Sequence, residues 1–350
     1  MKSKVLVIYQ FATFGGVERV LLNRAEAFKY YKKNFKLYVY FYSDCGAKKS
    51  LKDTIKKNGL NDYIEIIDNF NIKDYDYIVA IDTPQFLNDC NVDLSKVYIE
   101  THTFEKKYRK YLDEYYNKVK KIIVPSEIFK NQLIKEYGNE FSSKINVVNN
   151  FVPWDIEKNN NEKVILPDWS KKILFYFGRM DNNKNVKEIA DSFKKYLKNY
   201  SDDMLLILIG VDDPEYNVKK YVKDCKIDNK VIFLPPINFN KVDVLLNSLQ
   251  EKKAIFVSSS KGETFGLSAA ETLSFNIPTI LSDIEAHKKL VNNNKQLIYS
   301  LGNTDELAKK IYDTSKNYDI IVDDIGCYKL DFSAKKFIRD WNELFSDKDK

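Results

Sequence analysis

Short β-rich runs alternate with helical stretches along this sequence, and this alternation constrains the fold more than any other feature. Strands that are joined through helices run parallel, and a parallel sheet is covered by helices on both faces. In the first part of the chain the predicted strands are Lys4–Tyr9, Phe35–Tyr42, Tyr63–Ile67, Tyr77–Ile81, Val97–Glu100 and Lys121–Val124, and the predicted helices are Val17–Tyr31, Lys48–Asn58 and Glu127–Tyr137. We therefore expect an α/β fold.

The alternation restarts after a polar segment, residues 156–170, which has the composition of a solvated linker. Beyond it the predicted strands are Ile173–Gly178, Met204–Gly210, Val231–Leu234, Ala254–Ser259 and Pro278–Ser282, and the predicted helices are Lys187–Tyr200, Val218–Cys225, Ser268–Phe275 and Thr304–Lys316. We therefore expect an N-terminal domain (1–155), the linker (156–170), a C-terminal domain (171–325) and a final segment (326–350) with a helix at Asp331–Phe345.

The composition indicates a folded protein, since 44% of the 350 residues are hydrophobic and 30% are charged. The net charge of +6 lies wholly in residues 1–150, which hold 25 Lys and Arg against 19 Asp and Glu. Four scattered cysteines and two histidines have no metal-site or redox-motif spacing, so we interpret the cysteines as buried free thiols in a reducing compartment. No apolar run suits a signal peptide or a membrane span, and we expect a cytoplasmic protein.

The strongest motif is the stretch Ser258–Glu271, in which a buried strand ends in three serines and a loop with two glycines follows. A helix is predicted to begin near Leu267. Free amides at a helix N-terminus bind anions, and open α/β sheets bind ligands at the carboxyl ends of their strands. The alternative is an ordinary strand–loop–helix connection in which a carboxylate caps the helix.

A second motif, Phe177–Asn185, also follows a predicted strand and places Arg179 and Lys184 in one loop. An arginine fork and a lysine point charge suit a diphosphate. The alternative is a pair of solvated surface cations, which a chain with 56 basic residues offers in many places. The loop lacks the spacing of a Walker A motif.

Together, Arg179, Lys184 and the two glutamates Glu263 and Glu271, separated by seven residues, resemble the donor site of retaining glycosyltransferases of family 4, which have the GT-B fold. The resemblance implies two facing Rossmann-like domains with parallel sheets and an interdomain cleft, and a last helix that returns toward the N-terminal domain. Other segments match the family in order and spacing, namely Gly15–Val20, Val124–Glu127, Asn150 and Pro278–Asp283.

The resemblance also implies roles for single residues. Glu263 contacts hydroxyls of the donor sugar, Glu271 binds the ribose, and Arg179 and Lys184 neutralise the leaving diphosphate, so that no metal ion or other cofactor is needed. The remaining donor-binding residues of this motif are Phe265, Gly266, Leu267 and Ser268.

In the N-terminal half, the resemblance assigns Gly15 and Gly16 to a loop whose backbone approaches the reaction centre closely. It assigns His102 to a contact with the donor sugar, and we include it among the catalytic residues with Glu263, Arg179 and Lys184. A strand-to-helix turn and a structural histidine are the alternatives. The chain departs from the family at Phe151, at Asn185 and at Pro235-Pro236, and the last of these leaves the nucleobase open.

The segment Phe104–Lys121 is predicted to be helical, basic and aromatic. One interpretation is peripheral contact with the inner face of an anionic membrane, through the basic N-terminal domain. The other, which we favour, is an amphipathic helix whose tyrosines pack on the core while its lysines face water.

The function that the resemblance implies is retaining transfer of a hexosyl or N-acetylhexosaminyl group from a nucleotide sugar, with a UDP-sugar expected. The acceptor is a glycan, a lipid-linked or a protein-linked molecule of surface polysaccharide or glycoconjugate biosynthesis, and no nucleic acid is expected as a partner. A non-catalytic, glycosyltransferase-like binding or chaperone subunit is the alternative, and the four intact motif residues argue against it. A Rossmann oxidoreductase is disfavoured because no G-x-G-x-x-G follows the first strand.

Overall fold

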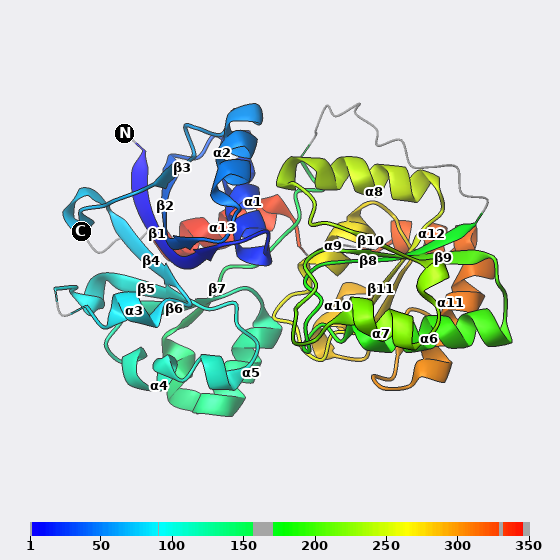
Figure 1. The fold of residues 1–350 in the computed structure, drawn as a ribbon. Coiled ribbons are helices and arrows are strands. Elements are labelled where there is room, and N and C mark those ends of the chain that lie inside the picture. The colour runs from blue at the N-terminus through cyan, green and yellow to red at the C-terminus, as the bar shows by residue number, and fades with distance from the viewer. Residues whose placement is uncertain (1, 90, 157–170, 329–331, 346–350) are drawn as a thin grey trace. The chain divides into compact units, whose positions relative to one another are not determined.

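The structure, a computed structural model, describes residues 2–89, 91–156, 171–328 and 332–345. The chain divides into two compact units, one of residues 1–157 and 331–350 and the other of residues 158–330. Apart from Ile156, the predicted linker lies outside the described residues. Asp331, the first residue of the predicted last helix, also lies outside them. Each unit is built on a parallel sheet that packs against helices (Figure 1).

In the first unit the described strands form a seven-stranded parallel sheet with the order β3-β2-β1-β4-β5-β6-β7. Its strands are β1 (Ser3–Ala12), β2 (Phe35–Asp44), β3 (Ile64–Ile67), β4 (Tyr77–Ile81), β5 (Val97–Glu100), β6 (Lys121–Val124) and β7 (Ile145–Val147). Its helices are α1 (Gly16–Tyr30), α2 (Lys48–Lys57), α3 (Pro84–Leu87), α4 (Tyr111–Tyr115), α5 (Glu127–Tyr137) and α13 (Ala334–Phe345).

Helix α13 belongs to the first unit although its sequence follows the whole second unit. Its apolar residues recur at helical spacing and form one buried face. Trp341 is fully buried, and its ring centroid lies 5.4 Å from that of Phe28 on α1 and 4.5 Å from that of Phe345. The last helix therefore completes the core on the α1 side of the first sheet.

In the second unit the described strands form a six-stranded parallel sheet with the order β10-β9-β8-β11-β12-β13. Its strands are β8 (Lys172–Phe177), β9 (Met204–Ile209), β10 (Val231–Leu234), β11 (Ile255–Ser258), β12 (Thr279–Ser282) and β13 (Ile298–Tyr299). Its helices are α6 (Val186–Asn199), α7 (Val218–Asp224), α8 (Val242–Glu251), α9 (Leu267–Ser274), α10 (Glu285–Leu290), α11 (Thr304–Lys316) and α12 (Tyr318–Gly326).

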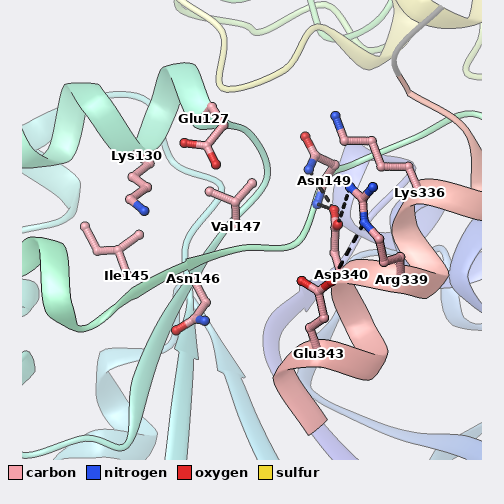
Figure 2. A pocket seen from close by; sticks show the side chains of 10 residues that line it. All are labelled: Glu127, Lys130, Ile145, Asn146, Val147, Asn149, Lys336, Arg339, Asp340 and Glu343. Carbon is pink, nitrogen blue, oxygen red and sulfur yellow. Dashed lines mark hydrogen bonds and ion pairs between the residues drawn. The ribbon is translucent and has the colours of Figure 1, made fainter. Parts of the chain in front are cut away.

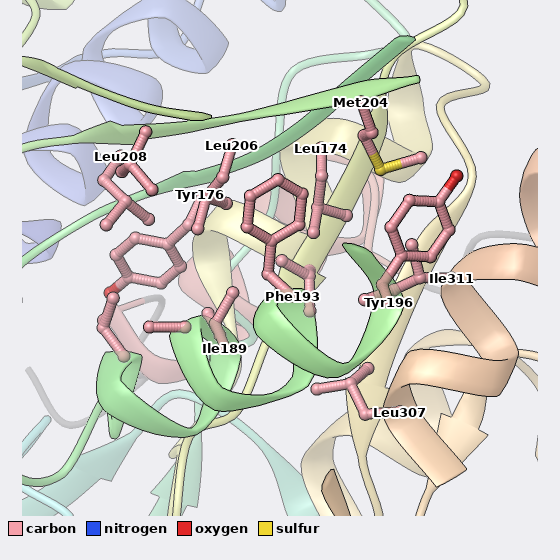
Figure 3. Packing of buried hydrophobic residues seen from close by; sticks show 14 of the residues in the cluster. Leu174, Tyr176, Ile189, Phe193, Tyr196, Met204, Leu206, Leu208, Leu307 and Ile311 are labelled. Carbon is pink, nitrogen blue, oxygen red and sulfur yellow. The ribbon is translucent and has the colours of Figure 1, made fainter. Parts of the chain in front are cut away.

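One face of the second sheet is buried beneath α6 and α11 (Figure 3). Ile189, Phe193 and Tyr196 are spaced four and three residues apart, so they project from one side of α6 onto the strands. The strand side of this cluster includes Leu174 and Tyr176 of β8, and Met204, Leu206 and Leu208 of β9.

Two predictions about local structure are wrong. Phe104–Lys121 is not one helix: it contains a 3-10 turn at Lys106–Tyr108 and the short helix α4. Between them Arg109 is fully buried and donates to the carbonyl oxygen of Phe104 and to the Glu136 carboxylate, so tertiary contacts override the helical pattern. The interpretation that the tyrosines of this segment pack on the core holds for Tyr115, which is buried, but not for Tyr108, which is exposed.

The prediction of buried cysteines is wrong for Cys45 and Cys327, which are both exposed.

The sequence patterns also missed β7, β13, α8 and α12. The two strands have only three and two residues, which is too short for a recognisable alternation. No helix in the described parts of the chain is long and apolar enough to cross a membrane.

Two glycines let the ends of neighbouring strands approach closely in the second unit. Gly178 follows β8 with φ +148°, and Gly210 follows β9 with φ +142°. A Cβ atom on Gly210 would lie 1.9 Å from the carbonyl oxygen of Gly178. Backbone atoms cannot yield at such a distance, so both the conformation and the space require glycine at this position.

We expect Gly210→Ala to lower the free energy of unfolding by about 1–3 kcal/mol, since overpacking adds to backbone strain. Gly302→Ala is the matched control, because Gly302 also has a positive φ, +87°, but an added Cβ would meet no atom within 4 Å. Urea denaturation of both variants measures the difference. Equal losses in the two variants would show that the close approach to Gly178 contributes nothing.

Candidate active site

The two sequence motifs meet at the point where the strand order of the second sheet reverses. β8 and β11 are neighbours, with β9 and β10 on one side and β12 and β13 on the other. Open parallel sheets bind ligands outside the carboxyl ends of the strands at such a switch point. The loop after β8, residues 178–185, and the loop after β11, residues 259–266, both begin there.

Hydrogen bonds fasten these two loops to each other. The Asn183 amide donates to the carbonyl oxygen of Gly262 (3.0 Å), and the backbone N–H of Lys261 donates to the carbonyl oxygen of Asn183 (2.8 Å). The Ser259 hydroxyl donates to the carbonyl oxygen of Asn185 (2.8 Å). Asn185 adopts a left-handed conformation (φ 54°), which explains why a glycine is common at this position in the family that the sequence resembles.

Lys184 and Glu263, which the sequence predicts to act together, are in direct contact. The Lys184 ammonium donates to Glu263 Oε1 at 2.5 Å, and the Ser260 hydroxyl donates to the same oxygen at 2.7 Å. Both side chains are largely buried, at 21% and 15% exposed. Burial by itself raises the pKa of Glu263, but the Lys184 charge and the hydrogen bonds outweigh it, so the pKa lies below its usual value.

Helix α9 starts directly after this contact. Its N-cap residue, Gly266, has φ +89°, and an added Cβ there would lie 3.1 Å from Leu290. The first-turn amides include those of Leu267 and Ser268, which carry no intrahelical partner and are suited to bind an anion. Glu271 lies one turn into α9 and is buried. Phe265 is partly exposed.

Arg179 does not join Lys184 in the structure. Its side chain is 67% exposed, and its guanidinium lies 3.4 Å from the Asp181 carboxylate. The structure therefore brings together Lys184 and Glu263 at the start of α9, while Arg179 stands at the solvent side of its loop. Its predicted phosphate contact stays a prediction.

His102 lies in the first unit, just beyond the carboxyl end of β5. Its Nε2 is 2.7 Å from Glu100 Oε1, and its backbone N–H donates to Asp82 (2.8 Å). Glu100 is fully buried and also accepts both terminal nitrogens of Arg24, at 2.9 and 2.5 Å. Burial opposes ionisation, but Arg24 and His102 hold the pKa of Glu100 well below its usual range.

Sequence reasoning missed Arg24 and Glu100. Their signal was a charged residue at the end of an otherwise apolar strand, and an arginine on the buried face of a helix. Charged groups are buried almost only when they are paired, so each of them implied a partner. The predicted contact of His102 with a sugar stays a prediction.

Gly15 and Gly16 differ in what surrounds them. A Cβ on Gly15 would lie 2.8 Å from the Thr13 hydroxyl and 3.2 Å from Glu18 Oε2, whereas one on Gly16 would meet no atom within 4 Å. Glu18 folds back to accept hydrogen bonds from the Thr13 backbone and hydroxyl at the start of α1. The Thr13 hydroxyl and the Glu18 carboxylate together occupy the space that a Cβ on Gly15 would need. The predicted approach to a ligand stays a prediction for both glycines.

A polar cavity of about 390 Å³ lies elsewhere in the first unit, beside β7 and α13 (Figure 2). Asp340 accepts the Asn149 side-chain amide there at 2.7 Å, and Arg339 pairs with Asp340. These contacts fasten α13 to the chain just beyond β7. None of the predicted site residues lines this cavity, which is surrounded by Glu127, Lys130, Ile145, Asn146, Val147, Asn149, Lys336, Arg339, Asp340 and Glu343.

His287, which is not one of the predicted site residues, lies next to the motif loops. It is 1% exposed on α10, and its ring lies beneath Gly266, where an added Cβ would be 3.6 Å from Cδ2. Nδ1 lies 3.2 Å from the carbonyl oxygen of Ser282. Burial lowers the pKa of His287 to about 4, so the imidazole is neutral at pH 7.

This low pKa predicts a loss of stability in mild acid. Below pH 6.5 the unfolded chain binds a proton at His287 that the folded chain does not bind until about pH 4. The free energy of unfolding should therefore fall by up to about 1.4 kcal/mol per pH unit across this window. Urea titrations at pH 7.0, 6.0 and 5.0, compared between the wild type and His287→Asn, isolate the effect. Parallel pH profiles of the two proteins would contradict it.

Comparison with known proteins bears on the second unit and on the fold as a whole. A family model described as glycosyl transferases group 1 matches residues 157–322. The O-antigen chain mannosyltransferase RfbU of Salmonella typhimurium is 27% identical over 203 residues, which cover 57% of this chain and 53% of that protein. A probable sucrose-phosphate synthase of Thermosipho melanesiensis is 29% identical over 171 residues, covering 45% of this chain and 38% of that protein. The chain thus spans about half or less of the length of these curated relatives.

Solved structures match nearly the whole chain. TarM of S. aureus, solved with UDP, fondaparinux and alpha-GlcNAc-glycerol, aligns with a TM-score of 0.75 at 14% identity, over 99% of this chain and 100% of that one. HepE of Anabaena, solved with UDP and glucose, aligns with a TM-score of 0.74 at 15% identity, over 98% and 99%. At these identities the likeness shows the fold. The second unit of the chain thus belongs to the glycosyl transferases group 1, and the chain as a whole has the GT-B fold.

Proposed function

We propose that the chain is a retaining glycosyltransferase that transfers a sugar from a nucleotide sugar, with UDP as the expected nucleotide, to a glycan, lipid-linked or protein-linked acceptor. The observation that carries this proposal is the Lys184–Glu263 contact beside the N-terminus of α9, at the switch point of the second sheet. The UDP in the TarM and HepE structures supports a UDP-sugar. A GDP-mannose-dependent mannosyltransferase of Xanthomonas oryzae, 27% identical over 156 residues, makes GDP-sugars the second donor class to test.

In this proposal the second unit stabilises the charge that develops on the leaving diphosphate. The bond from the anomeric carbon to the phosphate oxygen breaks, a bond to the acceptor oxygen forms on the same face, and the acceptor proton passes to the leaving phosphate. The α9 amides, Lys184 and Arg179 meet the growing negative charge, and fixed donors of this kind lower the barrier without reorganisation. Since Lys184 has three N–H donors, it can bind a phosphate and keep its bond to Glu263.

Glu263 recognises the sugar, whereas Lys184 binds the diphosphate. Its Oε1 accepts both Lys184 and Ser260. Its Oε2 receives no hydrogen bond from the residues that the structure describes, and it is the oxygen that we assign to the sugar hydroxyls. Glu271 binds the ribose in this proposal. We further propose that the reaction needs no metal ion, so a chelator should leave the rate unchanged.

The two glutamates give the sharpest test, because they separate recognition of the sugar from recognition of the nucleotide. Glu263→Gln should weaken binding of the intact donor about ten- to a hundredfold and leave binding of the nucleoside diphosphate unchanged, since a hydrogen bond to a charged group contributes about 1.5–3 kcal/mol. Glu271→Ala should weaken both ligands. Calorimetry with UDP and a UDP-sugar, and with GDP and a GDP-sugar, measures the four affinities.

Turnover decides between an enzyme and a binding subunit. The purified chain should transfer or hydrolyse one of the nucleotide sugars that it binds, with or without EDTA. Tight donor binding without any turnover, with acceptor glycans present, would favour the non-catalytic subunit. Equal losses of donor and diphosphate binding in Glu263→Gln would make that loop a nucleotide clamp only.

Although the sequence pattern favours packing of the tyrosines on the core, we also propose a peripheral contact between the basic first unit and an anionic membrane. Tyr108 supports it, because this side chain is 62% exposed and Lys107 lies over its ring at 4.6 Å. Flotation with vesicles that contain anionic lipid should recover the wild type but less of Tyr108→Ser. Equal recovery on neutral vesicles would contradict an electrostatic contact.

A further inference from the structure

A chain of hydrogen bonds connects His287 on α10 with Glu263 in the loop after β11. His287 Nδ1 lies 3.0 Å from the Ser282 hydroxyl and 3.2 Å from the Ser282 carbonyl oxygen. The Ser282 hydroxyl donates to the carbonyl oxygen of Ser260 at 2.7 Å. The Ser260 hydroxyl donates to Glu263 Oε1, again at 2.7 Å. The bonds cross from Ser282, the last residue of β12, to Ser260 in the loop after β11.

The directions of these bonds follow from the number of protons available. The Ser282 hydroxyl has one proton and donates it to the carbonyl oxygen of Ser260. In the bond between His287 Nδ1 and the Ser282 hydroxyl, Nδ1 must therefore be the donor and the hydroxyl oxygen the acceptor. The neutral ring is therefore protonated at Nδ1. Each donor in the chain points toward Glu263, and the bonds from Ser260 and Lys184 both end on Oε1.

Burial makes this arrangement rigid. His287, Ser282 and Ser260 are each at most 1% exposed, so no water competes for their bonds. A buried polar group is costly unless it is hydrogen-bonded, and a buried network that is satisfied fixes its members in one geometry. An apolar side chain at position 287 would fill the space beneath Gly266, but it would leave the Ser282 end of the network without its donor.

We propose that His287, acting through Ser282 and Ser260, is a positioning residue that fixes the Glu263 carboxylate so that Oε1 holds Lys184 and Oε2 faces the donor sugar. This inference rests on the proposed function. It adds a buried histidine and a serine, both outside the donor motifs, to the residues that determine how well the sugar is recognised. Neither residue touches the substrate.

The test compares affinities for an intact nucleotide sugar and for the free nucleoside diphosphate. Ser282→Ala and His287→Leu break the network, and each should weaken the donor about tenfold while leaving the diphosphate unchanged. His287→Asn should keep near-wild-type values, because its amide nitrogen can donate from close to the Nδ1 position. Ser248→Ala is the matched control, since this buried hydroxyl donates to the carbonyl oxygen of Val244 on α8, outside the network.

Three outcomes separate the inference from the proposed function. A wild type that neither binds nor turns over any UDP- or GDP-sugar contradicts the proposed function. A donor affinity that stays unchanged in Ser282→Ala and His287→Leu overturns the inference alone. An equal loss of both ligands in these variants also overturns it, because it shows a general effect on the fold.

A spectroscopic measurement covers the case in which a variant fails to fold. The chain has only two histidines, so the nitrogen resonances of His287 in the wild type are assigned by comparison with His102→Asn. We expect the neutral Nδ1–H tautomer at pH 7. Finding the Nε2–H tautomer would overturn the inference, because Nδ1 would then have no proton to donate to Ser282.

Discussion

Arg179→Ala combined with Lys184→Gln lowers kcat by a factor of about 10² or more in the proposed reaction, since removing a single preorganised donor to a developing charge costs about 10²–10³. Glutamine is chosen at 184 because its amide can still donate to Glu263, so that the carboxylate keeps a partner while the positive charge is lost. Steady-state kinetics at saturating donor measures the effect. The melting temperature should change by only a few degrees, since Arg179 is mostly exposed.

The control removes two charges of the same unit that lie elsewhere. Lys220 pairs with Asp224 on α7, Lys253 pairs with Asp319, and all four side chains are exposed. Lys220→Ala with Lys253→Ala should leave kcat unchanged, which excludes an effect of net charge on its own. A kcat within twofold of the wild type in the Arg179/Lys184 variant would remove both residues from the phosphate site.

Arg24→Met lowers the free energy of unfolding by about 3–5 kcal/mol, the largest effect on stability that we expect from a single change in the first unit. Arg24 and Glu100 are at most 1% exposed, and the substitution leaves the Glu100 carboxylate buried, with His102 as its one ion-pair partner among the described residues. Methionine keeps most of the packing against Phe337 and Trp341, whose rings lie 5.7 and 5.2 Å from the guanidinium. The loss in the free energy of unfolding therefore measures the cost of the unpaired charge and not that of a cavity.

The double variant Arg24→Met with Glu100→Leu distinguishes the cost of an unpaired buried carboxylate from the cost of altered packing. Replacing both members of a buried ion pair by apolar groups is often neutral, so the double variant should regain most of the stability. Urea denaturation of the three proteins completes the comparison. A double variant that is as unstable as Arg24→Met would place the loss in packing, and would contradict the assignment to the unpaired carboxylate.

Local sequence patterns were sufficient to predict most of the individual helices and strands. The helix Thr304–Lys316 and the strands Tyr77–Ile81 and Val97–Glu100 have the predicted bounds. Their apolar periodicity and their flanking polar residues are local features of the chain, so a single sequence is enough to reveal them. The same patterns placed the two motif loops after strands, which was enough to predict an anion site at a helix N-terminus. They failed for Phe104–Lys121, where the buried Arg109 determines the path of the backbone.

The contacts inside the candidate site were decided by the tertiary structure. Lys184 and Glu263 are 79 residues apart, and they meet because β8 and β11 are neighbours in the sheet. Arg24 and Glu100 are 76 residues apart, and the order of strands in the first sheet brings them together. Strand order is set by the packing of whole helices on whole sheets, and no local period encodes it. For the same reason the sequence located Glu263, but only the packing of β11 beside β12 placed His287 and Ser282 behind it.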